Sequence, residues 1–520
     1  MTQRWMALAR TGADPLIAVG LATAALLLRR HLPTDGLFYD DAWQTLGAAR
    51  GSLSELAIVG QTQPAFATEL MAWGRIFGTS DVSMVTPTLI AGFLGPPLVY
   101  LFLRRLGYAR SVSGLLGTAL AVAPVHVIYS TRVKSYTTDV LIILGIALGV
   151  GRLARWRWRP STAAGWVAGS AVVGSFSSFT LLAAVAAGIV LVLHPHDDRK
   201  VRGVAVAVQM LLHAAFLAAV SRRYNAQLVA DFFEGKDGFV ALDANPVELG
   251  RNLVTHLLRI VSVFPGVSGP EGWLLACLVT AVAGLVATAW RGPHPIPSRF
   301  LVLAALIALG GSLAGTVPFG PRSNPPISGG GRVTLWLVPA IALGLAASLE
   351  WLRRALVGRS GLRRTFDALA LVLAGVLLVT AIGTGKDYPP AGGREGTQYV
   401  MARLDERDAV WITRPTTFSF ALYADTPLRI QATPERSIGF LPDFVDPRFT
   451  VIADFYPDAE DLQASVEGAD RVWVVHANVD PSGPLYKPYR IGLAIELTAA
   501  GFEPERTVDV GLTVVDLWQR

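Results

Sequence analysis

The sequence is poor in cysteine and in charge. Its single cysteine, Cys277, lies inside an apolar run, so no disulfide can form within the chain. Only 16% of the 520 residues are charged, whereas soluble domains carry about 25%. A deficit of this size indicates that much of the chain lies in a medium that penalises charge, which argues against an ordinary soluble protein.

Apolar runs take the place of the missing charge. Hydrophobic residues make up 52% of the chain, and runs of about 18–20 apolar residues, each long enough to cross a bilayer, recur along it. They predict about eleven membrane-spanning helices. The expected spans lie near 15–31, 83–103, 111–129, 136–151, 163–174, 178–193, 202–220, 272–290, 300–317, 333–350 and 366–383. The alternative for 163–193 is one long helix kinked at Gly174 and Ser175. That alternative makes the number of spans even and reverses the side of every later loop.

Loop charge tests this count. With the N-terminus inside, the turn after every even-numbered helix is basic, as the positive-inside rule asks. Removing one span places half of these clusters outside, so loop charge favours eleven spans. The basic excess is therefore a topology signal and does not indicate nucleic-acid binding. One exception is Arg29-Arg30-His31, which falls on the expected outer side.

The outer side then receives the long segments, namely 32–82, 129–135, 221–271, 318–331 and 384–520. Within the first of them, residues 64–78 are apolar but short and contain Glu69 and Arg75. That composition is typical of an amphipathic helix that lies in the membrane interface.

The tail differs from the rest of the chain in charge and in pattern. Residues 384–520 contain 13 Lys and Arg against 21 Asp and Glu, a net charge of −8. Short β-branched and aromatic runs at 408–414, 470–479 and 512–518 predict strands, and segments near 395–405, 458–467 and 490–501 predict helices. We therefore expect a transmembrane domain over residues 1–383 and a soluble extracytoplasmic α/β domain over 384–520. The tail shows no GxGxxG loop, no metal-ligand cluster and no triad.

Two adjacent carboxylates are the strongest candidates for chemistry. Asp40 and Asp41, in GLFYDDAWQTLG, follow the first span and precede a helical pattern. The alternative is structural, because Asp is favoured at helix N-caps in solvated loops.

Cations occur at the expected outer ends of apolar helices. Arg132 and Lys134 lie in the short turn YSTRVKSY, and Arg332 opens a helix after a Gly- and Pro-rich loop. A guanidinium binds phosphate bidentately and an ammonium adds a point charge, so these residues predict a phosphate clamp. Arg222 and Arg223, in the 221–271 loop, are lesser candidates. The alternative is that the cations snorkel toward the interface.

Together these motifs resemble the GT-C superfamily of membrane glycosyltransferases, which includes protein O-mannosyltransferases, aminoarabinose transferases of lipid A and actinobacterial arabinofuranosyltransferases. Its members have an acidic pair soon after the first helix, here YDDAW, and many bacterial members follow it with a proline-containing segment, here QTQPAFATELMAWGRIFG. Many also carry S-x-E-x-R-x-Y between the third and fourth helices and R-Y-x-x-x-x-x-P at a late helix. The four motifs occur here in the same order between residues 1 and about 383.

The chain departs from the family pattern at several positions. Arg132 and Lys134 stand where S-x-E-x-R-x-Y has Glu and Arg, although Ser130 and Tyr136 match. Val333 stands where the family has Tyr after the late Arg. These departures leave the donor contacts and the donor sugar open.

The resemblance implies an inverting glycosyltransferase of the bacterial cytoplasmic membrane. Such an enzyme moves a hexose or pentose from a polyprenyl-phosphate donor to a hydroxyl of an envelope glycan, lipid or protein at the outer face. Most of the superfamily needs no metal for the reaction, so we expect no cofactor. The oligosaccharyltransferases are an exception, and the alternative that they imply is a divalent metal ion held by Asp40 and Asp41. The residues implied are the base Asp40 with its neighbour Asp41, the phosphate ligands Arg132, Lys134, Arg332, Arg222 and Arg223, and the substrate contacts Tyr39, Gln63 and Tyr136.

Rival functions make different demands on the sequence. A transporter or flippase of lipid-linked sugars needs polar groups at mid-membrane depth, whereas the spans here are nearly free of charge at their centres. A membrane anchor for the tail needs only one helix. A polymerase or ligase of lipid-linked glycans is close in mechanism and stays open.

Overall fold

The computed structural model describes the chain in ranges. They are residues 2–29, 32, 36–60, 63–221, 238–240, 245–263, 271–292, 294–319, 331–356, 360–383, 393–433, 439–452, 458–477 and 486–520. The chain forms two compact units. One comprises Met1–His31 and Thr86–Lys386, and the other comprises Leu32–Val85 and Asp387–Arg520.

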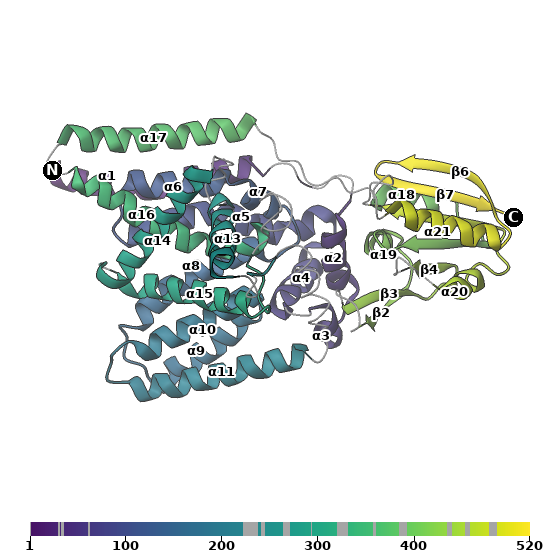
Figure 1. Cartoon of the computed structure of the whole chain (residues 1–520), viewed down its shortest axis with the longest axis horizontal. Coiled ribbons are helices and arrows are strands. Elements are labelled where there is room, and N and C mark those ends of the chain that lie inside the picture. The colour runs from purple at the N-terminus through teal and green to yellow at the C-terminus, as the bar shows by residue number, and fades with distance from the viewer. Residues whose placement is uncertain are drawn as a thin grey trace. The chain divides into compact units, whose positions relative to one another are not determined.

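The first unit is helical throughout its described residues (Figure 1). Its elements are α1 (Thr2–Leu27), α5 (Asp81–Arg105, whose first turn belongs to the second unit), α6 (Arg110–Val122), α7 (Pro124–Tyr129), α8 (Tyr136–Leu153), α9 (Pro160–Gly174), α10 (Ser178–Leu193), α11 (Arg199–Ser221), α13 (Pro246–Val263), α14 (Glu271–Arg291), α15 (Pro295–Leu313), the 3-10 helix η2 (Gly331–Leu337), α16 (Val338–Ala355) and α17 (Ser360–Gly383).

The unit is that of a multi-pass membrane protein. Seven of the helices that the structure describes are long and apolar enough to cross a bilayer, namely α5, α8, α11, α14, α15, η2 with α16, and α17. Three shorter apolar helices, in α1, α6 and α10, coincide with further expected spans. Helix α9 covers the remaining one. The count of eleven spans stays a prediction, because length and composition support seven.

Residues 163–193 form two helices and not one. Helix α9 ends at Gly174, and α10 begins at Ser178 after the capping residue Ser177, whose hydroxyl accepts a hydrogen bond from the Thr180 N–H at 3.1 Å. The two helices pack against each other (Figure 1). The kinked single helix is therefore excluded.

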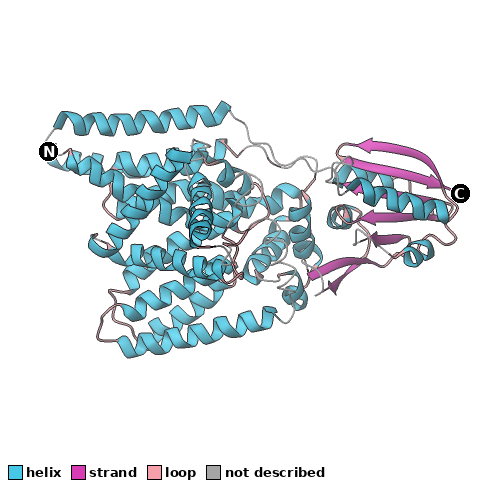
Figure 2. Ribbon diagram, in the orientation of Figure 1, coloured by secondary structure: helices cyan, strands magenta, loops and turns pink. Residues whose placement is uncertain are grey.

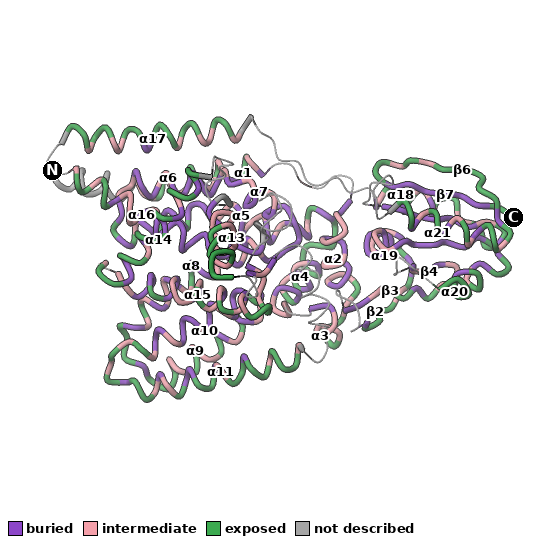
Figure 3. Tube along the Cα trace, viewed as in Figure 1, coloured by how far each residue is buried: buried purple, intermediate pink, exposed green. Residues whose placement is uncertain are grey.

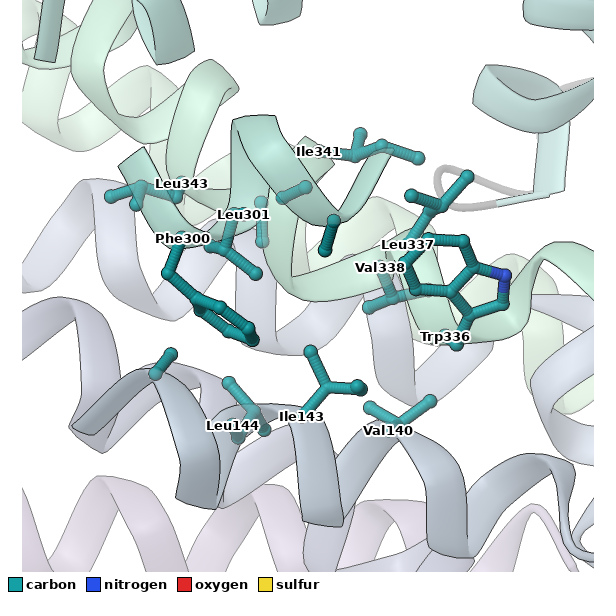
Figure 4. Close-up of a cluster of buried hydrophobic side chains, with 14 of the residues drawn as sticks. Val140, Ile143, Leu144, Phe300, Leu301, Trp336, Leu337, Val338, Ile341 and Leu343 are labelled. Carbon is teal, nitrogen blue, oxygen red and sulfur yellow. The ribbon is translucent and has the colours of Figure 1, made fainter. Parts of the chain in front are cut away.

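An apolar core joins the helices of this unit. Val140, Ile143 and Leu144 of α8 pack with side chains of α15, η2 and α16 (Figure 4). Helices α14 and α16 approach closely, because a Cβ added at Gly344 would lie 2.0 Å from the Ala281 carbonyl oxygen. Small residues let apolar helices approach in this way.

The second unit contains a five-stranded sheet with helices on both faces (Figure 2). The strand order is β4-β1-β5-β7-β6, parallel for the first three and antiparallel at β7 and β6. Helices α20 and α21 pack on one face, and α18 and α19 on the other. The bounds are α18 (Gly393–Met401), β1 (Asp408–Thr413), α19 (Thr417–Tyr423), β2 (Leu428–Thr433), β3 (Gly439–Phe444), β4 (Phe449–Ile452), α20 (Ala459–Ala464), β5 (Arg471–Ala477), α21 (Tyr486–Ala499), β6 (Glu503–Val510) and β7 (Thr513–Gln519).

The three strands and three helices expected in the tail are confirmed as β1, β5 and β7 and as α18, α20 and α21. The sequence pattern missed β2, β3, β4, β6 and α19. Burial separates the predicted strands from two of the missed ones. Strands β1, β5 and β7 are buried nearly throughout, whereas β2 is exposed at half of its residues and β6 is mostly exposed (Figure 3).

Residues 32–85 pack with the tail although the sequence places them between the first two expected spans. They form α2 (Tyr39–Arg50), η1 (Leu53–Glu55), α3 (Leu56–Val59) and α4 (Pro64–Phe77). Helix α2 packs on α4 and on α19, and α3 packs on β3. The expected boundary at residue 383 divides the chain into two continuous stretches. The compact units differ from that division, because residues 32–85 belong to the unit that contains the tail.

Candidate functional site

The acidic pair lies in the first turn of α2. Phe38 is the N-cap residue and makes no side-chain cap, so Asp40 and Asp41 are the second and third residues of the helix. The structural alternative, an Asp at the N-cap, does not describe them. Partial positive charge at a helix N-terminus favours carboxylates there. Asp41 is fully buried, whereas Asp40 is half-buried and retains access.

Aromatic rings of the tail hold this helix. Tyr39 packs edge-on against Phe418 with ring centroids 5.5 Å apart, and Trp43 stacks on Phe440 at 6.4 Å. Phe418 and Phe440 also contact each other at 5.5 Å. The predicted substrate contact Tyr39 therefore has at least one structural role, in fixing the turn that carries the acidic pair.

Helix α4 matches the amphipathic segment predicted over 64–78. Gln63 is its N-cap residue and is half-buried. The buried residues Phe66, Leu70 and Met71 lie on one face, which fits the packing of α4 on α2. Burial raises the pKa of Glu69 on the same helix. Helices α2 and α4 thus each carry a carboxylate that is at least partly buried, Asp41 on α2 and Glu69 on α4.

The turn between α7 and α8 encloses the two predicted phosphate ligands. Arg132 and Lys134 are 5% and 7% exposed, so they do not snorkel toward a surface. The Arg132 carbonyl accepts hydrogen bonds from the Thr88 hydroxyl at 2.7 Å and from the Lys134 N–H at 2.9 Å. Cations held where water screens them little attract an anion strongly.

Arg29 is the one residue of the basic cluster on the expected outer side that the structure describes, since Arg30 and His31 lie outside the described residues. Its side chain is 1% exposed and donates to the Ser130 hydroxyl at 2.7 Å and to the Ala25 carbonyl at 2.7 Å, and its NH2 group lies 2.6 Å from the His126 ring. Gly92 permits this packing, because a Cβ there would lie 2.0 Å from that of Ser130. Arg29 therefore ties the end of α1 to the start of the cationic turn.

The late motif that begins at Arg332 lies next to the turn between α7 and α8, within the first unit. Segment η2, which contains Arg332, packs on α7 and α8, the two helices that flank the turn. Trp336 of η2 stacks on Phe179 at 5.7 Å. Tyr136 packs edge-on against Tyr129 at 5.3 Å. The Arg332 side chain, Arg222 and Arg223 lie outside the described residues.

Sequence reasoning missed one acidic residue beside this turn. Asp139 lies in the first turn of α8 and is 1% exposed. The signal was present, because an ionisable side chain in an apolar span marks a functional site by default. Over the ranges that the structure describes, no group of three or more His, Cys, Asp or Glu side chains is arranged to hold a metal ion; the expectation of no cofactor stays a prediction.

A cavity of about 640 Å³ lies elsewhere in the second unit. Residues of α21, β6 and β7 line it, among them Lys487, Arg490 and Arg506. Arg490 is engaged by Asp516, which accepts a hydrogen bond from its Nε at 2.9 Å. The acidic pair does not line this cavity.

Comparisons with known proteins agree with the motifs on the fold. No family model matches the sequence, and no curated protein matches it. The crystal structure of ArnT from Cupriavidus metallidurans in the apo state is similar with a TM-score of 0.56, 12% identity and 98% coverage of both chains. The structure of that protein bound to undecaprenyl phosphate gives a TM-score of 0.55, 13% identity and coverage of 99% of this chain and 98% of that one. The present chain therefore shares the fold of ArnT over almost its whole length.

Proposed function

We propose that the chain is an inverting glycosyltransferase that takes a hexose or pentose from a polyprenyl-phosphate donor. The observation that carries the proposal is a shared fold over 98% of both chains with ArnT, a protein also solved with undecaprenyl phosphate bound. The order of the acidic pair, the cationic turn and the late Arg supports it. The acceptor is a hydroxyl of an envelope glycan, a lipid or a protein.

The proposed reaction is a single displacement. The acceptor oxygen attacks the anomeric carbon, its proton passes to the Asp40 carboxylate, and the bond from that carbon to the phosphate oxygen breaks. Asp40 suits the role of base because it is half-buried at a helix N-terminus, with the fully buried Asp41 next to it. The lipid phosphate leaves with its electron pair, so no second acid is needed.

Negative charge grows on the phosphate as that bond breaks. Fixed cations in a site with little water stabilise such charge strongly. Arg132 and Lys134 are enclosed by protein, and we assign them to the phosphate together with Arg332. The proposal places the reaction at the outer face of the cytoplasmic membrane, with the tail outside.

The experiment replaces Asp40 with Asn, which keeps the size of the side chain and removes its basicity. Membranes that contain the Asp40→Asn protein are supplied with radiolabelled polyprenyl-phosphate sugars, and label entering lipid-extracted glycan or protein is counted. We expect a loss of at least a hundredfold, with binding of undecaprenyl phosphate unchanged. Asp461→Asn, an exposed Asp on α20, is the control. Full transfer by Asp40→Asn would overturn the assignment of the base.

A further inference from the structure

Tyr423, the last residue of α19, joins two segments that are distant in the sequence. Its hydroxyl oxygen accepts a hydrogen bond from the Leu37 N–H at 2.7 Å, and its O–H donates to an Asp81 carboxylate oxygen at 2.9 Å. Desolvation raises the pKa of Tyr423, so the phenol keeps the proton that it donates. One hydroxyl thus uses both its acceptor and its donor capacity.

Arg394 reinforces this junction. It forms an ion pair with Asp81, and its guanidinium lies 5.0 Å from the centroid of the Tyr423 ring. Gly393 brings α18 against α19, because a Cβ there would lie 2.4 Å from the Ser419 side chain. Asp81 is 3% exposed. A buried carboxylate with these partners fixes the position of the groups around it.

The junction lies directly before the acidic pair. Leu37 precedes Phe38, the N-cap residue of α2, and Asp40 lies three residues after Leu37. The Tyr423 hydrogen bond therefore fixes the backbone where it enters α2. The rings of Tyr39 and Trp43, packed on Phe418 and Phe440, fix the helix further along the same segment.

We propose that the C-terminal α/β domain positions the acidic pair and that Tyr423 is the positioning residue. The proposal rests on the proposed function, because it takes Asp40 to be the general base. A displacement of about 1 Å in a reacting group costs on the order of a hundredfold in rate. The domain then acts on the chemical step without touching the substrate.

The test is Tyr423→Phe, which keeps the ring and its contact with Arg394 but removes both hydrogen bonds. We expect kcat to fall at least tenfold while KM for the polyprenyl-phosphate donor stays within twofold. A role in stability alone would lower the amount of folded protein and leave kcat per folded molecule unchanged. Tyr399→Phe is the matched control, because Tyr399 lies half-buried on α18 and packs edge-on against Trp473 at 6.2 Å.

Hydrogen exchange in the full-length protein gives a readout that does not depend on activity. We expect the α2 amides of residues 42–50 to exchange at least tenfold faster in Tyr423→Phe, with the amides of β5 unchanged. Unchanged exchange in α2 would overturn the proposal, whether or not kcat falls, and so would a rise in KM alone. If the wild-type protein transfers no sugar, the proposed function is refuted. Faster exchange in Tyr423→Phe would then still show that Tyr423 fixes α2.

Discussion

At the scale of single residues, burial excludes one interpretation of two predicted cations. In the sequence, Arg132 and Lys134 fit interfacial cations as readily as phosphate ligands. Their low exposure argues against interfacial cations, and their role as phosphate ligands stays a prediction. Arg29 looked like an error of topology, whereas its bonds to Ser130 and Ala25 make it a structural tie. Sequence spacing cannot show the contact with Ser130, because Arg29 and Ser130 are 101 residues apart.

Lys134→Gln tests the phosphate ligand, since it keeps the length of the side chain and removes the charge. A hydrogen bond to a charged group contributes about 1.5–3 kcal/mol, so we expect the Kd for undecaprenyl phosphate to rise about 10- to 100-fold. Titration of the detergent-solubilised protein with that lipid measures it. Lys487→Gln, at an exposed position on α21, is expected to bind as the wild type does. Equal affinities for all three proteins would remove Lys134 from the site.

At the scale of elements, the sequence predicts the helices well and their contacts poorly. Every expected span overlaps a helix, because span length and loop charge are local properties. The span expected at 111–129 is divided between α6 and α7, which begins at Pro124. Strands β1, β5 and β7 were found because they are buried and β-branched, whereas the half-exposed β2 and the exposed β6 carry no such pattern. The packing of α2 on α19 has no local signal, since it joins residues that are nearly 400 positions apart.

The crossing of α14 and α16 provides a test of element packing. Gly344→Ala adds a methyl group where the Ala281 carbonyl oxygen lies 2.0 Å away, and such overpacking costs about 1–3 kcal/mol. We expect a lower thermal unfolding midpoint. Gly375→Ala on α17 meets nothing within 4 Å and gains helix propensity, so its midpoint should be unchanged or higher. Equal midpoints for the two variants would mean that the crossing is not close-packed.

At the scale of the whole molecule, charge divides along the chain. The tail is acidic and the loops of the helical part are basic, which is the distribution expected when the tail lies outside the membrane and the basic turns lie inside. This arrangement is a proposal about topology, and the scarcity of cysteine makes it easy to test.

Replacing Cys277 with Ser leaves a chain without cysteine. Arg155→Cys in the turn after α8 and Glu467→Cys after α20 then introduce single exposed thiols. We expect a membrane-impermeant maleimide to label Glu467→Cys in intact spheroplasts and Arg155→Cys only after the membrane is opened. The reverse pattern would place the tail inside the cell and rule out transfer at the outer face.

The second unit is built from two stretches of chain that synthesis separates in time. Residues 32–85 emerge early, and the tail that packs on them emerges after roughly 300 more residues, a delay of roughly 15–60 s at about 5–20 residues per second. During that interval α2 exists without α19 and β3, so α2 gains its packing partners only after the tail has been synthesised. A truncated chain would thus keep its spans and lose the support of its acidic pair, which makes completion of the tail the last step in building the site.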